Sequence, residues 1–448
     1  TPTKIAARPP RGFGPDLIKR LPSPTDKSRM TSETRNPSVS LKSTFRFPPS
    51  PRGATMTDDV LILSGTRTPI GSLNGALASV SAPQLGSICV REALSRADAP
   101  PDQVDEVILG NVVSAGVGQN PARQAAIHAG VPVGVGATTV NKVCGSGLKA
   151  VMLAAQAVRL GDADLIVAGG MESMSQAPYL LPKARQGYRL GHGELLDAVI
   201  HDGLWDVYDQ QNMGGFGDRC AAKFNFSRQE QDDFAVRSYT RALAAMDSGV
   251  LAAEIVPVET RDRKTTVLVS ADEEPQRFNE EKLRSLRPAF GADGTVTAGN
   301  ASSVNDGAAA LTICSRRKCE ELGVVPIARI VGSATFSQEP EWFTTAPIGA
   351  LRKLTAALEW PLDSIDLFEI NEAFAVVTMA AERELNLPAK KVNILGGAVS
   401  LGHPIGCTGA RILITLLTAL RHSGGKRGIT CLCIGGGEAI ALAIELTS

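Results

Sequence analysis

The sequence is poor in aromatic residues, carries no net charge and contains no long apolar run, and each of these properties excludes a class of protein. Aromatic residues make up 4% of the 448 residues and hydrophobic residues 43%, so the core must consist mainly of aliphatic side chains and alanine. Basic and acidic residues balance at 46 each, which gives no reason to expect nucleic acid or a membrane surface as a partner. No apolar run reaches the ~18 residues that a membrane span needs.

Cysteines are also few. Eight cysteines in a chain of this length are too sparse for a disulfide scaffold, and no pair of CxxC motifs indicates a zinc site, so we predict no metal. A reducing compartment is the simpler expectation. Cys431 and Cys433 alternate within the apolar run Thr430–Ile434, which predicts that both lie on one face of a strand.

The first 56 residues differ in composition from the rest. They hold 11 Lys and Arg against 3 Asp and Glu, and 10 of the 27 prolines. Such a segment cannot bury enough apolar surface to fold and is expected to be disordered. It resembles a transit peptide, which would place the protein in the mitochondrion. We favour the alternative that Met56 is the true start, that the upstream residues come from a misplaced gene start, and that the protein is cytoplasmic.

Two segments of the sequence repeat one order of features. Each has an Asp-x-x-Asp turn, a short apolar strand, a cysteine beside glycines, a helix-spaced apolar pattern, a second strand and a glycine pair or triplet. Strands that alternate with helical patterns indicate parallel sheets with helix crossovers. The repeat predicts two similar α/β halves with a cysteine at the start of a helix in each. The landmarks are Asp102–Asp105, Val107–Leu109, Cys144, Leu148–Val158, Asp164–Ala168 and Gly169–Gly170 in the first copy, and Asp363–Asp366, Leu367–Ile370, Cys407, Leu413–Leu420, Ile429–Ile434 and Gly435–Gly437 in the second.

Residues 174–304, between the two copies, are irregular and polar. This composition predicts a large insertion that covers a site, with helical stretches such as Ser227–Ser248.

Cys144 occupies a position where a thiol can be reactive. A helix N-terminus offers unpaired N–H groups and a partial positive charge, and both favour thiolate. Gly145 and Gly147 allow the backbone to approach a bound group, so N–H groups there can stabilise an oxyanion. The motif alone leaves open a small buried cysteine in a helix–sheet contact.

A glycine-rich loop, 396–409, adds candidate bases. It contains His403, one of five histidines, four residues before Cys407, and Pro404 stiffens it. A nucleophile needs a base, and a reaction that forms an enolate needs a second base and donors for the enolate oxygen. Asn371 follows a strand-like run, where α/β sheets place ligand groups, although a plain turn is the alternative there.

Four motifs resemble the thiolase family in the family's own order: Asn-Lys-Val-Cys144-Gly-Ser-Gly, Asn371-Glu-Ala-Phe, Gly402-His403-Pro-Ile-Gly-Cys407-Thr-Gly-Ala-Arg and the terminal Cys-Ile-Gly-Gly-Gly. The likeness begins at about Thr57 and reaches the C-terminus. The segments 286–290 and 297–302 resemble the short-chain branch, the acetyl-CoA acetyltransferases. The resemblance implies an α/β, thiolase-like fold: two duplicated α/β halves with mixed sheets, helices packed between them, and a loop domain inserted in the N-terminal half. The expected segments are 1–56 (extension), 57–173 (N-terminal half), 174–304 (insertion), 305–327 (return to the N-terminal half) and 328–448 (C-terminal half).

The resemblance also implies a mechanism. Cys144 attacks the thioester of acetyl-CoA while His403 accepts its proton, and Cys407 then removes an α-proton from a second acetyl-CoA. His403 and a water positioned by Asn371 hold the enolate oxygen, and the N–H groups of Cys144 and Gly409 hold the oxyanion. No metal or organic cofactor is expected, because the substrates are CoA thioesters. The family suggests a homotetramer, a dimer of dimers.

The resemblance also implies which residues contact CoA, although most of these could simply be core or loop residues. The sequence departs from the branch at Asn212-Met213, where the family usually has His-Met, and in the following run 214–218. This departure leaves the chain-length preference open. The implied contacts are Leu204, Met213, Phe290, Ala298, Ser302, Ala373 and Phe374.

Three alternatives were weighed. A degradative 3-ketoacyl-CoA thiolase for longer chains would use the same residues. A decarboxylating ketoacyl synthase usually pairs two histidines with its cysteine, which this sequence does not show. A non-catalytic acyl- or lipid-binding protein of this fold should have lost Cys144, His403 or Cys407, and all three are present.

Overall fold

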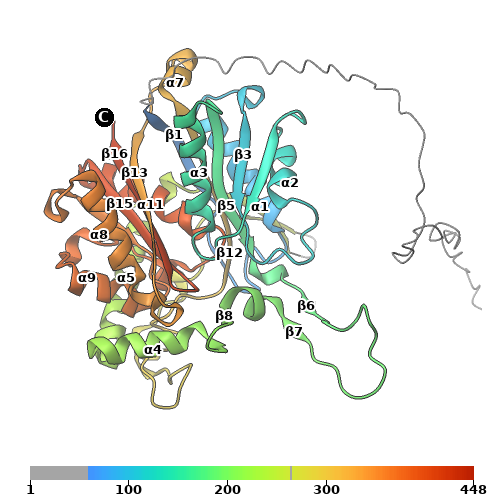
Figure 1. The fold of residues 1–448 in the computed structure, drawn as a ribbon, viewed down its shortest axis with the longest axis vertical. Coiled ribbons are helices and arrows are strands. Elements are labelled where there is room, and N and C mark those ends of the chain that lie inside the picture. Colours follow the sequence, from blue (N-terminus) through green and yellow to red (C-terminus); the bar gives the residue numbers. More distant parts are fainter. Residues whose placement is uncertain (1–58, 263–264, 448) are drawn as a thin grey trace, which may run out of the picture. The chain divides into compact units, whose positions relative to one another are not determined.

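The structure is a computed structural model that describes residues 59–262 and 265–447. The predictions about residues 1–56, and with them the cellular location, lie outside these residues. A ten-stranded sheet runs through the middle of the described body (Figure 1). Its order is β14-β15-β16-β13-β1-β12-β5-β3-β4, and β2 pairs with β12 beside this path. The strands are β1 (Val60–Arg67), β2 (Gly71–Ser72), β3 (Glu106–Gly110), β4 (Gly136–Val140), β5 (Leu165–Ser173), β12 (Asn305–Ser315), β13 (Ala328–Ser337), β14 (Leu367–Ile370), β15 (Arg427–Ile434) and β16 (Glu438–Leu446).

The direction of the strands corrects the expectation of parallel sheets. Only β3–β4, β3–β5 and β14–β15 pair in parallel, and the other pairs on the path are antiparallel. The parallel pairs are those joined through helices. The antiparallel pair β15–β16 is a hairpin whose turn, Gly435–Gly437, has positive φ at its last two glycines. The two halves meet where β1 pairs with β13 at Val60–Ile62. The fold is therefore the mixed, duplicated α/β architecture that the family resemblance implies.

Eleven α-helices of the described residues flank the sheet or lie between its halves. The predicted helix Ser227–Ser248 is α5, which begins with a capping box between Ser227 and Glu230. The helices are α1 (Ala82–Arg96), α2 (Pro121–His128), α3 (Ser146–Leu160), α4 (Met213–Phe224), α5 (Arg228–Asp247), α6 (Glu280–Ser285), α7 (Arg316–Leu322), α8 (Ala346–Leu358), α9 (Ala375–Glu384), α10 (Ala398–Leu401) and α11 (Thr408–Ser423). Short helical turns are η1 (Pro101–Gln103), η2 (Met174–Gln176), η3 (Val199–Leu204), η4 (Leu251–Ala253), η5 (Pro275–Arg277), η6 (Pro340–Thr345), η7 (Leu362–Ser364) and η8 (Ala389–Lys391).

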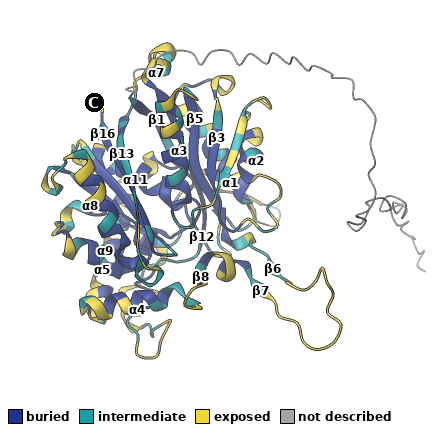
Figure 2. Cartoon of the chain, viewed as in Figure 1, coloured by how far each residue is buried: buried dark blue, intermediate teal, exposed yellow. Residues whose placement is uncertain are grey.

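Helices α3 and α11 form the buried centre of the molecule (Figure 2). Their first turns touch because glycine stands at both contact points. A Cβ on Gly147 would lie 2.9 Å from the Ala410 nitrogen, and a Cβ on Gly409 would lie 2.3 Å from the Leu148 nitrogen. By length and composition alone, the window Val143–Leu160 qualifies as a membrane span, with 56% of it buried. This corrects the statement that no apolar run is long enough, and its burial fits a core helix of this fold.

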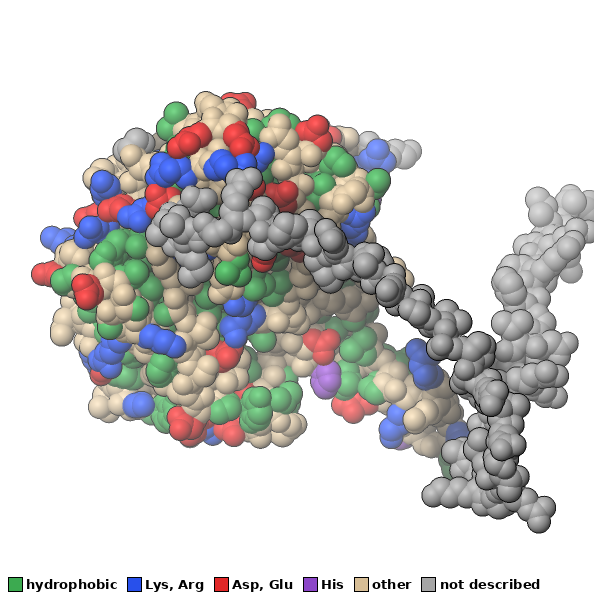
Figure 3. All heavy atoms as spheres, turned by 45° about the horizontal axis from the view of Figure 1, so that its top comes forward, with side chains coloured by type: hydrophobic (Ala, Val, Ile, Leu, Met, Phe, Trp, Pro, Cys, Tyr) green, Lys and Arg blue, Asp and Glu red, His purple; other side chains and the backbone are tan. Residues whose placement is uncertain are grey.

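The segment 174–304 forms three small hairpins and the helices α4 to α6. The hairpins are β6–β7 (Tyr179–Leu180 and Leu196–Asp197), β8–β9 (Trp205–Asp206 and Gln211–Asn212) and β10–β11 (Val258–Asp262 and Thr265–Val269). On the surface, basic and acidic side chains are mixed over the face in view in Figure 3. A mixed surface gives no strong field of one sign on that face.

Candidate active site

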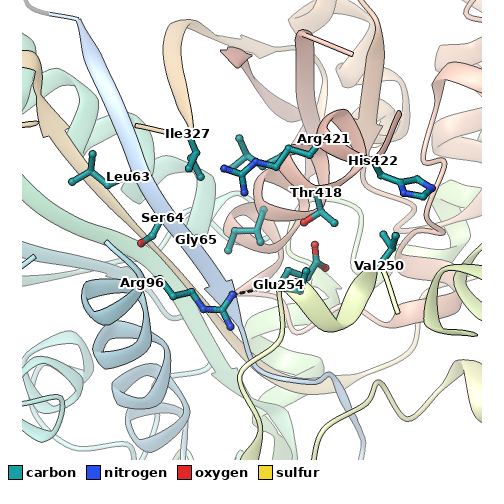
Figure 4. A pocket seen from close by; sticks show the side chains of 13 residues that line it. Leu63, Ser64, Gly65, Arg96, Val250, Glu254, Ile327, Thr418, Arg421 and His422 are labelled. Atoms are coloured by element: carbon teal, nitrogen blue, oxygen red, sulfur yellow. Dashed lines mark hydrogen bonds between the residues drawn. The ribbon is translucent and has the colours of Figure 1, made fainter. Parts of the chain in front are cut away.

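One large cavity lies away from the predicted reactive residues. A cavity of about 410 Å³ opens between β1, η4 and α11 (Figure 4). Its buried carboxylate, Glu254, already accepts hydrogen bonds from Arg67 and Thr415, at 2.6 and 3.0 Å. Its lining contains no cysteine and none of the predicted site residues. We therefore place the candidate active site elsewhere.

A second cavity, of about 270 Å³, brings Cys144 and His403 together with most of the predicted CoA contacts. Its walls come from the N-terminal half, the insertion and the C-terminal half. Apolar side chains dominate the lining, as is usual for a pocket that encloses a small molecule. The lining residues are Val143, Cys144, Met174, Ile200, Gly203, Leu204, Asn212, Met213, Phe290, Ala301, Ser302, Ser303, Val304, Phe343, Ala373, Phe374, His403, Ile405 and Gly435.

Cys144 lies in a tight turn just before α3. The preceding Val143 has φ +47°, and it is the one β-branched residue with positive φ among the described residues. A strained backbone of this kind costs about 1–3 kcal/mol and is typical of functional sites. Ser146 holds the turn, because its hydroxyl donates to the Val143 carbonyl at 2.7 Å and accepts from the Lys142 N–H at 2.8 Å.

The thiol of Cys144 needs a base. Burial raises its pKa to about 11, although the N–H groups of Gly435 and of Cys144 itself point at the sulfur and lower it. The N–H groups favour the thiolate, as expected, but burial has the larger effect on the pKa of Cys144 in the unliganded site. The same two N–H groups are placed to stabilise an oxyanion on a group bound to the sulfur.

His403 can supply that base. Thr408 donates its hydroxyl hydrogen to the Pro404 carbonyl at 2.9 Å, so its oxygen accepts from Nδ1–H of His403 at 2.6 Å. This arrangement assigns the proton to Nδ1 and leaves a lone pair on Nε2, which has no partner among the described residues. Burial, helped by Arg411, lowers the His403 pKa to about 3, so the imidazole is neutral and free to accept a proton.

Cys407 and Gly409, predicted as the second base and the oxyanion donor, do not line the cavity. Cys407 is the N-cap of α11, is 1% exposed and does not line the cavity. Burial raises its pKa to about 12, and the charges near it are those of Arg411, Arg67 and Glu172. Gly409 lies inside the contact between α3 and α11. No structural observation supports the predicted roles of these two residues as the second base and the oxyanion donor, and the roles stay predictions.

Cys433 and Gly435 both lie close to Cys144. Cys433 lies near the end of β15, where burial and, next in size, the nearby Cys144 thiol raise its pKa. Gly435 lines the cavity, and its N–H approaches the Cys144 sulfur. Sequence reasoning treated Cys433 as a strand residue, yet a signal was present. A cysteine two residues before a Gly-Gly-Gly turn at a strand end marks a close approach of backbone and ligand.

Asn371 lies just outside the cavity lining, at the end of β14. Its N–H donates to the Cys431 carbonyl at 2.9 Å. Both polar atoms of its buried side chain lack partners in the described part of the chain. Buried amides of this kind are usually paired with ordered water, which is compatible with the predicted role in holding a water. That role stays a prediction.

The insertion supplies most of the predicted CoA contacts, but Ala298 is exposed and does not line the cavity. Asn212 does line it and caps α4, accepting the Gly214 N–H at 3.3 Å. Phe290 lies against Gly214 so closely that a Cβ there would be 2.1 Å from the ring. Gly214, directly after Met213, therefore makes room for Phe290, which lines the cavity.

Glu172, which sequence reasoning did not single out, holds the loop between His403 and α11. Its carboxylate accepts the N–H groups of Gly406 at 2.9 Å and of Val112 at 3.0 Å, and burial raises its pKa to about 7. Within the described residues, no three His, Cys, Asp or Glu side chains gather in a way that could hold a metal ion.

Comparison with known proteins agrees with this architecture. Residues 60–317 match "Thiolase, N-terminal domain" and residues 324–446 match "Thiolase, C-terminal domain". The chain is 52% identical over 392 residues to acetyl-CoA acetyltransferase 2 of Arabidopsis thaliana, covering 87% of this chain and 97% of that protein. It is 49% identical over 388 residues to acetyl-CoA acetyltransferase of Pseudomonas aeruginosa, covering 86% and 99%.

Solved structures show the same likeness. The Bacillus anthracis acetyl-CoA acetyltransferase has a TM-score of 0.85 at 43% identity and covers 87% of this chain and 99% of that one. A thiolase from Ascaris suum in complex with coenzyme A has a TM-score of 0.83 at 42% identity, covering 87% and 100%. The chain belongs to the thiolase family.

Proposed function

We propose that the protein is an acetyl-CoA C-acetyltransferase, which condenses two molecules of acetyl-CoA reversibly to acetoacetyl-CoA and CoA. One observation carries the proposal: Cys144, the free Nε2 of His403 and the N–H of Gly435 meet at one small apolar cavity. The relatives named acetyl-CoA acetyltransferase support this substrate, and the coenzyme A bound to the Ascaris suum thiolase supports CoA thioesters.

The first half of the reaction acylates Cys144. Its sulfur attacks the thioester carbonyl while His403 Nε2 accepts the thiol proton, and the N–H groups of Gly435 and Cys144 hold the oxyanion. The bond between the carbonyl carbon and the CoA sulfur then breaks. The CoA thiolate takes a proton from Cys433, which leaves an acetyl-enzyme, an imidazolium and a Cys433 thiolate.

The second half forms the carbon–carbon bond. The Cys433 thiolate removes an α-proton from the second acetyl-CoA, and Nε2–H of His403 with a water held by Asn371 stabilises the enolate oxygen. The α-carbon attacks the acetyl carbonyl, and the bond to the Cys144 sulfur breaks. The Cys144 sulfur takes its proton back from His403, so all protons return to their starting groups. The thioester itself acidifies the α-carbon, so the proposal needs no metal or organic cofactor.

We propose a homotetramer as the assembly. The hairpin β6–β7 and its loop expose several large apolar side chains, which is unfavourable for an isolated surface and typical of an interface. These are Tyr179, Leu181, Leu190 and Leu195. Light scattering of the purified protein tests this, and a monomer at micromolar concentration would contradict it.

Mass spectrometry tests the chemistry. After incubation with acetyl-CoA, one acetyl group should appear on Cys144, and Cys144→Ser should abolish the burst of CoA. Acetylation at another residue would overturn the proposal. Thiolysis of acetoacetyl-CoA compared with a medium-chain 3-ketoacyl-CoA tests the substrate range, because a strong preference for the longer chain would favour a degradative thiolase.

A further inference from the structure

The turn that carries Cys144 is strained and is held in place by its neighbours. Val143 has a left-handed backbone that a β-branched residue rarely adopts. Its N–H donates to the Asn141 side chain at 3.0 Å, and Ser146 bonds both to its carbonyl and to the Lys142 N–H. These bonds fix the turn internally, but they do not fix it relative to the C-terminal half.

One ion pair crosses from this turn to the other half. Lys142 Nζ pairs with Glu438 Oε2, and the side chains are 22% and 32% exposed. Glu438 begins β16 directly after the Gly435–Gly437 turn, and Ser337 donates to its other oxygen at 3.2 Å. Within the described residues this is the only hydrogen bond that joins two side chains between residues 141–146 and 435–438.

The two segments so joined carry the groups that must act together. Lys142 is two residues before Cys144. Glu438 is three residues after Gly435, whose N–H approaches the Cys144 sulfur. The intervening turn consists of glycine alone, so no side chain of its own restricts it. A displacement of about 1 Å at a reacting centre can cost about 100-fold in rate.

We propose that the pair Lys142–Glu438 is a positioning clasp that sets the Gly435 N–H against the Cys144 sulfur and thereby governs the rate of acylation. The inference rests on the proposed function. Neither side chain touches the reacting atoms, since neither lines the cavity. The clasp connects the nucleophile of one half with the oxyanion donor of the other.

A charge-swap cycle tests the clasp. Lys142→Met and Glu438→Gln should each lower the rate constant of acylation about tenfold, with KM for acetyl-CoA changed less than about threefold. The double variant Lys142→Glu with Glu438→Lys should return to within about threefold of wild type, because the pair is restored. Rapid-quench measurement of CoA release reads the acylation step alone.

A matched control comes from another partly exposed ion pair. Arg237 and Glu382 join α5 to α9, and their side chains are 31% and 15% exposed. Both residues are far from Cys144 in the sequence, and neither lines the cavity that contains Cys144. Arg237→Met should leave acylation within about twofold of wild type, because surface pairs contribute little by themselves.

The outcomes distinguish a failure of the clasp proposal from a failure of the proposed function. Acylation at the wild-type rate in Lys142→Met or Glu438→Gln overturns the clasp, and so does a charge swap that fails to recover. If the methionine variant does not fold, the nearly isosteric Glu438→Gln still decides the question. A wild-type enzyme that releases no burst of CoA from acetyl-CoA overturns the proposed function instead.

Discussion

Removing the hydroxyl of Thr408, which is hydrogen-bonded to His403, should slow the acylation of Cys144 although neither His403 nor Cys144 is substituted. Thr408→Val keeps the shape of the side chain but removes the oxygen that accepts Nδ1–H at 2.6 Å. The buried imidazole then has two choices. It can keep the proton on Nδ1 without an acceptor, or it can move the proton to Nε2 and lose the lone pair that accepts the Cys144 proton.

The structure sets the size of this effect. Leaving a buried donor unpaired costs about 1–3 kcal/mol, which corresponds to about 5- to 150-fold in rate. The loss should appear in the burst of CoA release from acetyl-CoA, measured by rapid quench at pH 7, while KM changes little. Thr408→Ser retains the oxygen and should stay within about threefold of wild type.

A burst in Thr408→Val within about twofold of wild type would refute the assignment of the proton to Nδ1. Thermal unfolding provides the folding control, because Thr408 also donates to the Pro404 carbonyl in the same loop. Slow acylation together with recovery in Thr408→Ser is the result that the geometry requires.

Three further outcomes are expected. Cys433→Ser should slow acetyl-enzyme formation and stop condensation, whereas Cys407→Ser should condense acetyl-CoA at close to the wild-type rate. Radiolabelled acetyl-CoA measures both steps, and the reverse pattern would identify Cys407 as the base. Gly214→Ala should displace Phe290, whose ring would lie 2.1 Å from the new Cβ, and raise KM for acetyl-CoA about tenfold in steady-state assays; an unchanged KM would show that the ring does not contact substrate. Because burial raises the Glu172 pKa from 4.5 to about 7, the folded state binds more protons between these values, so the stability this group contributes at low pH is lost as pH rises through 7. Urea unfolding should show wild type losing up to about 3 kcal/mol relative to Glu172→Gln from pH 4.5 to 8, and an equal pH dependence in both would contradict the shift.

The sequence predicted the duplicated halves because each half repeats the same local pattern. The strand Val107–Leu109 and the helical spacing after Cys144 correspond to β3 and α3. Strand direction was not predictable from the same pattern. The antiparallel partner of β5 is β12, which begins at Asn305, after the long segment 174–304. No local spacing predicts a pairing between strands so far apart in the sequence.

The same repeat also gave no sign that Cys407 lies outside the cavity lining. The repeat places Cys144 and Cys407 at equivalent helix starts, and the structure confirms that both lie there. Equivalent positions in the two halves do not face one site, however. The first turns of α3 and α11 pack against each other through Gly147 and Gly409, and that contact buries Cys407 instead of opening it to a cavity.

The active cavity therefore uses unlike parts of the two like halves. The N-terminal half contributes a helix-start thiol, and the C-terminal half contributes His403 and Gly435. Cys433, a strand-end thiol close to Cys144, does not itself line the cavity. An asymmetric site of this kind suits the proposed reaction, because one thiol must carry the acetyl group while the other moves protons. Two thiols in equivalent places would have equal environments. Here the Cys144 sulfur accepts the Gly435 N–H, whereas Cys433 is fully buried in β15. The two thiols therefore differ in environment, as their separate tasks require.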